Sequence, residues 1–193
     1  GFTLLELMVT LSIASILMAV GLPSMQNIVV HDRLVSQANE LVATLQFARS
    51  EAVKRMLPIS VCASSDASSC VTSSLNSWEV GWITFVDNNY SNGSATSRDG
   101  VGGSSEEELF GSAGLGRSGY TVRSDSTVDG YITFLINGRS NRSGTFVLCH
   151  SADVTKAVAV FVSNAGRVYS GKDRDGNGVP EDEFGTNVTS CTP

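Results

Sequence analysis

Histidine and basic residues are scarce in this sequence, closely spaced cysteine pairs are missing, and each of these absences excludes a class of function. Only two histidines, His31 and His150, occur among 193 residues. No set of nucleophile, base and acid is recognisable around them, so we predict no enzymatic activity. The four cysteines include no Cys-x-x-Cys pair, and neither histidine has zinc-ligand spacing, so no zinc site is expected. With 13 basic and 19 acidic residues, the net charge of −6 argues against a general phosphate-binding surface.

Charge is almost absent from the first part of the chain. The 21 residues from Phe2 to Leu22 contain one charged side chain, Glu6. As a helix they would span roughly 31 Å, close to the ~30 Å hydrocarbon core of a bilayer, so we predict a transmembrane helix. An unpaired carboxylate in lipid costs about 2.5–3.5 kcal/mol. Two interpretations stay open: Glu6 lies at the level of the lipid headgroups, or it pairs with a charge that a partner supplies.

A second helical segment follows, with its apolar residues confined to one face. Pro23 should kink or weaken the helix because it removes a main-chain hydrogen bond, but the helical period resumes after it. Leu57-Pro58 ends the pattern. We predict a membrane segment over residues 1–30 and a globular domain over 31–193, with a helix at 31–56, strands within 59–169 and a tail at 170–193. The expected apolar face consists of Leu34, Ala38, Leu41, Leu45, Ala48 and Ala52.

The hydrophobic period changes from 3.6 to 2 after this helix, which predicts β-strands. Asn137-Gly138 is a turn dipeptide, so we expect the strands on either side of it to form a hairpin. The strand at 157–162 is the most apolar and should be central. A helix followed by antiparallel strands predicts an α+β fold in which the helix packs on a sheet. The expected strands are 59–62, 78–86, 131–136, 144–149, 157–162 and 167–169.

The four cysteines, Cys62, Cys70, Cys149 and Cys191, allow three disulfide pairings. An even number of cysteines in a chain exported by an N-terminal helix indicates disulfide bonds. We favour Cys62–Cys70, which would close a short serine-rich loop, and Cys149–Cys191, which would attach the C-terminal tail to a strand.

The first residues, Gly1-Phe2-Thr3-Leu4-Leu5-Glu6, resemble the processing site and N-terminal helix of type IV pilins and type II secretion pseudopilins. The resemblance implies that a prepilin peptidase cuts between Gly1 and Phe2 and that the Phe2 amine is methylated. It also implies that Glu6 pairs with the Phe2 amine of a neighbouring subunit during assembly. Pro23 matches a proline that the family carries at the end of this segment. We expect a precursor with a basic leader before Gly1, and a mature chain that begins at Phe2.

Three further segments resemble the branch that includes the type II secretion pseudopilin GspH and the minor pilins FimT and FimU. They are the helix at 33–55, the pattern W-x-x-G-W-x-x-F-x-D over 78–87, and the turn at 166–168. The resemblance implies a type IV pilin-like fold and a structural role as a minor pilin in the complex that primes or caps a type IV pilus. Other minor and major pilins would be its partners, through their N-terminal helices.

The same resemblance implies a location. The chain would be anchored in the inner membrane before assembly, with its globular domain in the periplasm. Two alternatives remain: a type II secretion pseudopilin and, from another class, a DNA-binding minor pilin in natural transformation.

No cofactor is required by this interpretation, but the tail contains a candidate calcium loop. Asp173, Asp175 and Asn177 would turn side-chain oxygens inward, Val179 would offer its carbonyl, and Glu181 would close the ring. The loop departs from an EF-hand because its twelfth position is not glutamate. The alternative is an acidic turn in solvent, since Asp, Asn and Gly are the commonest turn residues.

Three arginines are candidate DNA contacts. A Gly-Arg-x-Arg motif near the C-terminus is associated with DNA binding in FimT-like minor pilins, and residues 166–169 match its first arginine, Arg167, but have Tyr169 in place of the second. Arg139 and Arg142 lie on a predicted turn and could add charge. The missing arginine, the net negative charge and the acidic tail count against DNA as a partner.

Overall fold

The computed structural model divides the chain into two compact units, Gly1–Arg33 and Leu34–Pro193. Helix α1 (Leu4–Arg55) contributes to both and is assigned as continuous through Pro23. The side chains at 20–27, 90–91, 94–95, 109 and 111–113 are not described. The described residues are 1, 3–71, 77–87, 90–91, 94–95, 109–113, 119–128, 130–181 and 185–191.

In the second unit, α1 packs by the face that the sequence predicts. Each of the six apolar residues from Leu34 to Ala52 named above is at most 1 % exposed. The helix contacts the strand that begins at Trp82 and a turn that contains Gly138. The Trp82 indole Nε1 donates a hydrogen bond to Thr44 Oγ1 at 3.2 Å, and Arg49 donates to Gly138 O at 2.9 Å. The predicted amphipathic helix is therefore confirmed, because a 3–4 spacing places these residues along one side of the helix.

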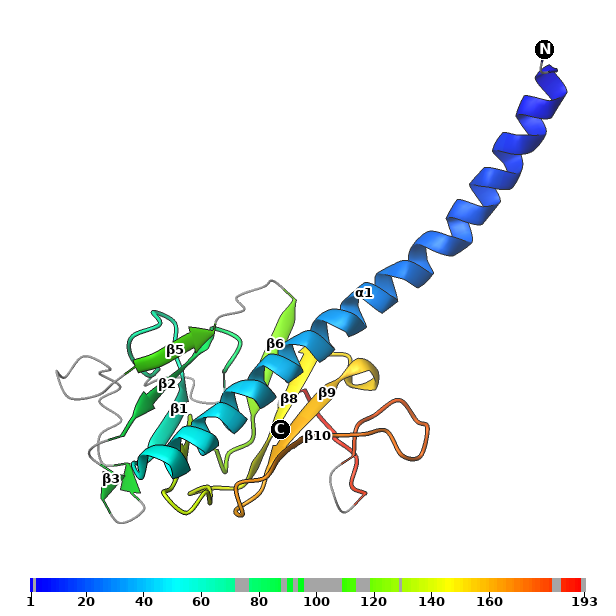
Figure 1. The fold of residues 1–193 in the computed structure, drawn as a ribbon. Helices are drawn as coiled ribbons and strands as arrows, with labels where there is room; N and C mark the ends of the chain where they lie inside the picture. The colour runs from blue at the N-terminus through cyan, green and yellow to red at the C-terminus, as the bar shows by residue number, and fades with distance from the viewer. Residues whose placement is uncertain are drawn as a thin grey trace. The chain divides into compact units, whose positions relative to one another are not determined.

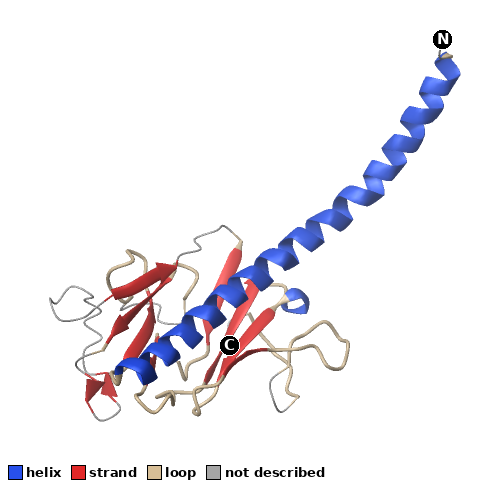
Figure 2. Ribbon diagram, in the orientation of Figure 1, coloured by secondary structure: helices blue, strands red, loops and turns tan. Residues whose placement is uncertain are grey.

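The strands form two four-stranded antiparallel sheets and one small hairpin (Figures 1 and 2). The first sheet has the order β5-β2-β1-β7, and the second has the order β10-β9-β8-β6. The fold is α+β, as predicted. The elements of the first sheet are β1 (Ile59–Ala63), β2 (Trp82–Val86), β5 (Leu109–Ala113) and β7 (Tyr131–Phe134); those of the second are β6 (Tyr120–Ser124), β8 (Gly144–His150), β9 (Val158–Val162) and β10 (Val168–Ser170); β3 (Tyr90–Ser91) pairs with β4 (Ser94–Ala95), and a 3-10 helix, η1 (Val154–Lys156), precedes β9.

The predicted strand 78–86 is too long at its start, because the chain changes sheets there. The Trp78 N–H donates to Val122 O in the second sheet, while β2 begins only at Trp82 in the first. Between them the Gly81 N–H donates to Trp78 O, and Gly81 has φ +120°, a conformation that favours glycine. The alternating pattern of apolar residues in the sequence does not show that the chain passes from one sheet to the other here.

The predicted hairpin between 131–136 and 144–149 is wrong. The Asn137-Gly138 turn does form, with φ +75° at Gly138, and the Asn141 N–H returns to Thr133 O. The chain then leaves for the other sheet: β7 pairs with β1, whereas β8 pairs with β6 and β9. Residues 146–149 in β8 are fully buried, and both edges of β8 are already paired, with β6 on one side and β9 on the other.

The other expected strands are confirmed. Strand β9 lies inside its sheet between β8 and β10, as its apolar sequence predicts. The turn before β10 is closed by the Gly166 N–H, which donates to Ser163 O at 2.7 Å.

Both favoured disulfides form. Cys62–Cys70 closes the serine-rich loop after β1, and Cys149–Cys191 joins β8 to the C-terminal tail. Cys62 packs with Ile83, Phe85 and Tyr131. The second disulfide packs beside Val147 and Ala157. Each disulfide therefore lies against a sheet as part of the hydrophobic core.

Candidate functional site

The start of α1 carries a helix cap that the sequence interpretation missed. Thr3 is the residue before the helix, and its Oγ1 accepts a hydrogen bond from the Glu6 N–H at 3.2 Å. Its carbonyl accepts from Leu7 N at 3.2 Å. The spacing Thr-x-x-Glu is that of a capping box, so the signal was present in the sequence. The Glu6 carboxylate belongs to the first turn, where the helix dipole favours a negative charge.

Phe2, the predicted methylation site, lies outside the described residues, and so does the side chain of Pro23. Gly1 and Glu6 are exposed. The proposed pairing of Glu6 with a neighbour's amine stays a prediction.

The first unit leaves its apolar side chains uncovered. Leu4 is 78 % exposed and Leu17 is 68 % exposed, and the large apolar residues between them are also exposed. Soluble monomers rarely expose contiguous apolar patches of this kind unless a partner or a membrane covers them. Within the part of the chain that the structure describes, no helix has the length and apolarity needed to cross a membrane. The predicted membrane span is thus not confirmed.

A pocket of about 850 Å³ lies in the second unit, between one face of α1 and β10. Of the described side chains that line it, four are basic and none is acidic. One of them is Arg167, a predicted DNA contact. The residues that line this pocket, called here the basic pocket, are Gln46, Arg49, Ser50, Val53, Lys54, Arg167, Val168, Tyr169 and Arg174.

The other two predicted DNA contacts are placed differently. Arg142 packs over the Tyr131 ring at 4.7 Å and donates to the carbonyls of Thr127 and Val128 at 3.3 and 3.2 Å. Its guanidinium thus holds a turn together. Arg139 is exposed and does not line the basic pocket. DNA binding by the three arginines stays a prediction.

The candidate calcium loop forms a set of turns held by its own main chain. The two Asp173 carboxylate oxygens accept from the N–H groups of Gly176 and Gly178 at 2.8 and 2.9 Å. These bonds, chiefly the one from Gly178, lower the pKa of Asp173. Asp175 and Asn177 likewise accept from main-chain N–H groups two residues ahead.

The residue predicted to close the calcium ring faces the same loop. Glu181 is buried, and its Oε2 accepts from the Arg174 N–H at 3.2 Å. Among the described residues, no group of three or more metal-ligating His, Cys, Asp or Glu side chains converges. Val179, which was predicted to offer its carbonyl, donates its N–H to Asn177 Oδ1. Calcium binding stays a prediction.

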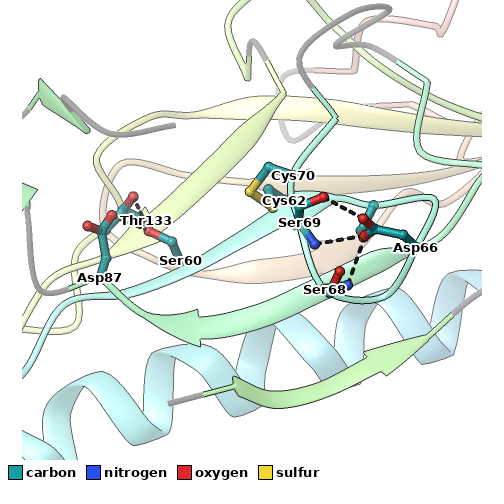
Figure 3. The surroundings of a disulfide bond; sticks show 9 residues. Ser60, Cys62, Asp66, Ser68, Ser69, Cys70, Asp87 and Thr133 are labelled. Carbon is teal, nitrogen blue, oxygen red and sulfur yellow. Dashed lines mark hydrogen bonds between the residues drawn. A yellow bond between two sulfur atoms is a disulfide. The ribbon is translucent and has the colours of Figure 1, made fainter. Parts of the chain in front are cut away.

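Two polar clusters surround the first disulfide (Figure 3). Ser60 lies on β1, where its hydroxyl donates to Asp87 Oδ2 at 2.7 Å and lies 2.7 Å from Thr133 Oγ1. All three residues are buried. Asp87 is the last residue of the W-x-x-G-W-x-x-F-x-D pattern, and the hydrogen bonds that Ser60 makes with Asp87 and Thr133 satisfy polar atoms that would otherwise be costly to bury.

The second cluster organises the disulfide loop. The Asp66 carboxylate accepts from Ser69 Oγ at 2.6 Å and from the N–H groups of Ser68 and Ser69 at 2.9 and 2.7 Å. The hydroxyl of Ser69, followed by these main-chain bonds, holds the pKa of Asp66 well below its usual range. The loop geometry is therefore set by one carboxylate between the two cysteines.

The helix, the two antiparallel sheets and the N-terminal motif together define a pilin-type subunit. A family described as "Type II transport protein GspH" matches residues 37–166, about two thirds of the chain. The "Prokaryotic N-terminal methylation motif" matches residues 1–22. The chain therefore belongs to the GspH family, whose members are structural pilins, as the sequence resemblance indicated.

Solved structures show the same fold. The type IV minor pilin FimU of Pseudomonas aeruginosa (strain PAO1) matches in one crystal form with 23 % identity and a TM-score of 0.54, covering 83 % of this chain and 96 % of FimU. A second crystal form gives 22 % identity and a TM-score of 0.52, with 82 % and 99 % covered. No curated protein matches this chain.

Proposed function

We propose that this chain is a minor pilin of a type IV pilus, a structural subunit of the complex that primes assembly or forms the tip. The observation that carries the proposal is the exposed apolar helix of residues 4–18, which lies within the N-terminal methylation motif, in a chain of the GspH family. FimU, which shares the fold, is a type IV minor pilin.

Assembly would cover the exposed helix. Keeping one leucine side chain out of water contributes about 1.5–3 kcal/mol, so these side chains need cover at every stage, and in the filament neighbouring N-terminal helices would supply it. Before assembly, the inner membrane would cover the same residues, with the globular domain in the periplasm. A prepilin peptidase would cut between Gly1 and Phe2, and Glu6 would pair with the Phe2 amine of the next subunit.

A type II secretion pseudopilin is the second candidate, and the family description favours it. Cleavage and methylation at the N-terminus would be the same in a minor pilin and in a pseudopilin, so the helix does not distinguish the two candidates. A strain that lacks the gene separates them directly. Loss of surface pili with intact protein export supports the minor pilin, and loss of export with intact pili supports the pseudopilin.

The assembly role is tested by changing Glu6 to Ala. We expect the variant to be produced and folded but strongly depleted from sheared filaments, measured by immunoblot against the cell fraction. Glu40→Ala is the matched control, because Glu40 is an exposed glutamate on the same helix and should not affect incorporation. Normal incorporation of the Glu6 variant would refute the role of this carboxylate in assembly.

A further inference from the structure

The basic pocket concentrates positive charge in an acidic protein. Arg49, Lys54, Arg167 and Arg174 are four of the 13 basic residues, in a chain of net charge −6. Among the residues that the structure describes, no Asp or Glu lines the pocket. Its helical wall consists of residues spaced three and four apart, next to the buried stripe of α1 and not part of it. The fold thus brings together charges that lie more than a hundred residues apart.

The wall of the pocket is preformed, because hydrogen bonds within the chain hold it in place. Arg49 Nε donates to Gly138 O at 2.9 Å, and its Nη2 donates to Ala165 O at 3.4 Å, so this arginine joins two turns. A Cβ on Gly166 would lie 2.0 Å from Gly138 O, so the two turns touch and only glycine fits there. This contact places the main chain of Arg167 beside α1.

Arg174 is also held by its main chain. Its N–H donates to the carboxylate of the buried Glu181. The neighbouring Asp173 turns both oxygens to the N–H groups of its own loop.

Lys54 contributes a movable charge. Its Nζ lies 3.2 Å from Glu51 Oε1, and its side chain is 74 % exposed. Glu51 also binds Arg55 at 2.6 Å through its other oxygen. Lys54 can therefore turn toward a ligand while Glu51 keeps an ion pair with Arg55.

The lining favours a peptide carboxylate as the ligand. Val53, Val168 and Tyr169 add apolar surface among the charges, which suits the methylene groups of glutamate. The volume of about 850 Å³ falls within the range of ligand pockets. A DNA duplex needs an extended basic surface, whereas here the four basic side chains surround one pocket of about 850 Å³, a size that suits a short peptide segment.

We propose that the basic pocket binds an acidic segment of a partner protein, one with several carboxylate side chains on a short stretch. This contact goes beyond assembly through the N-terminal helix and does not depend on it. The charges would supply orientation and specificity, because paired surface charges steer an encounter more than they strengthen it.

Isothermal titration calorimetry of the full chain in detergent micelles tests the proposal. The probe is hexaglutamate with blocked termini, and hexaglutamine is its uncharged control. We expect heat from hexaglutamate only, with affinity that falls as salt is raised from about 20 mM to about 200 mM. The double variant Lys54→Gln/Arg174→Gln should bind about tenfold more weakly. Arg49 is left unchanged because it holds two turns together.

The matched control removes the same charge outside the pocket. Arg139→Gln/Lys156→Gln should bind hexaglutamate like the unchanged protein, and so should Glu6→Ala, which separates this proposal from the assembly role. Equal loss in both double variants, or no binding of hexaglutamate, would overturn the proposal. Duplex DNA that binds at least as tightly as hexaglutamate would also overturn it, and would assign the pocket to nucleic acid. Melting curves confirm that the variants are folded.

Discussion

Two parts of one helix treat their apolar side chains in opposite ways. In the first unit Leu11 is 62 % exposed, whereas in the second unit Leu45 is fully buried. Both residues belong to α1. The second part has polar residues opposite its apolar stripe and finds its cover in the sheets of the same chain. The first part is apolar all round, and a helix of that kind needs cover from other molecules. One helix thus packs on its own domain in one part and leaves apolar side chains exposed in the other, which is the surface that the proposed assembly would use.

The sharpest test of this comparison is a matched pair of leucine truncations. Leu45→Ala should lower the free energy of unfolding by about 2–5 kcal/mol, because it leaves a cavity in the core. Leu11→Ala should leave the unfolding of the globular unit unchanged and weaken assembly instead. Tryptophan fluorescence during unfolding reports the difference, since Trp78 and Trp82 are buried. Equal effects of the two changes would contradict the division of the helix.

The two disulfides of the second unit should contribute different amounts to its stability, because they close loops of different length. Replacing Cys149 and Cys191 by alanine should cost about 4 kcal/mol, because the bond closes a separation of 42 residues. Replacing Cys62 and Cys70 should cost about 2.5 kcal/mol, for a separation of 8. Thermal unfolding of the two double variants shows which disulfide contributes more to stability. A larger loss from the shorter loop would show that packing, and not loop entropy, dominates.

The smallest effect is expected at Asp66 and depends on pH. The pKa of Asp66 is lowered in the folded protein by the Ser69 hydroxyl and the nearby main-chain N–H groups. Its contribution to stability is therefore complete above the ordinary aspartate pKa of about 4, and is lost as the pH falls toward the lower folded value. Asp66→Asn should melt below the unchanged protein at neutral pH, and the gap should narrow in acid.

The control for this change is Asp32→Asn, at an exposed aspartate of the first unit. It should leave the melting of the globular unit unaltered at every pH. If the difference in melting temperature between Asp66→Asn and the unchanged protein did not vary with pH, the loss of stability would come from altered packing or hydrogen bonding and not from the charge of Asp66.

Local patterns predicted most of the elements correctly. The stripe from Leu34 to Ala52, the apolar strand β9 and the turn at Gly166 each depend on residues close in sequence. The disulfide Cys62–Cys70 is similarly local. The helix cap at Thr3 was equally readable from the Thr-x-x-Glu spacing but was missed. The family followed from the first six residues together with the matching segments of the domain.

Long-range pairing was predicted less well. The turn at Asn137-Gly138 forms as expected, yet the strands on either side of it join different sheets. A turn dipeptide specifies a reversal over a few residues, but the choice of sheet depends on which distant strand offers a buried edge. The prediction that the strand begins at Trp78 is wrong for the same reason. Trp78 bonds to β6 in the second sheet, whereas Trp82 in β2 pairs with β1 in the first.

The amino-acid order alone was enough to establish the helix, its two kinds of surface, the strand content and the family, because these follow from periodicity and from short motifs. Tertiary structure alone decided the partition of strands into two sheets and the gathering of Arg49, Lys54, Arg167 and Arg174 around one pocket. Such contacts join residues far apart in the chain, and their stability comes from the burial of many side chains at once, which no local pattern contains.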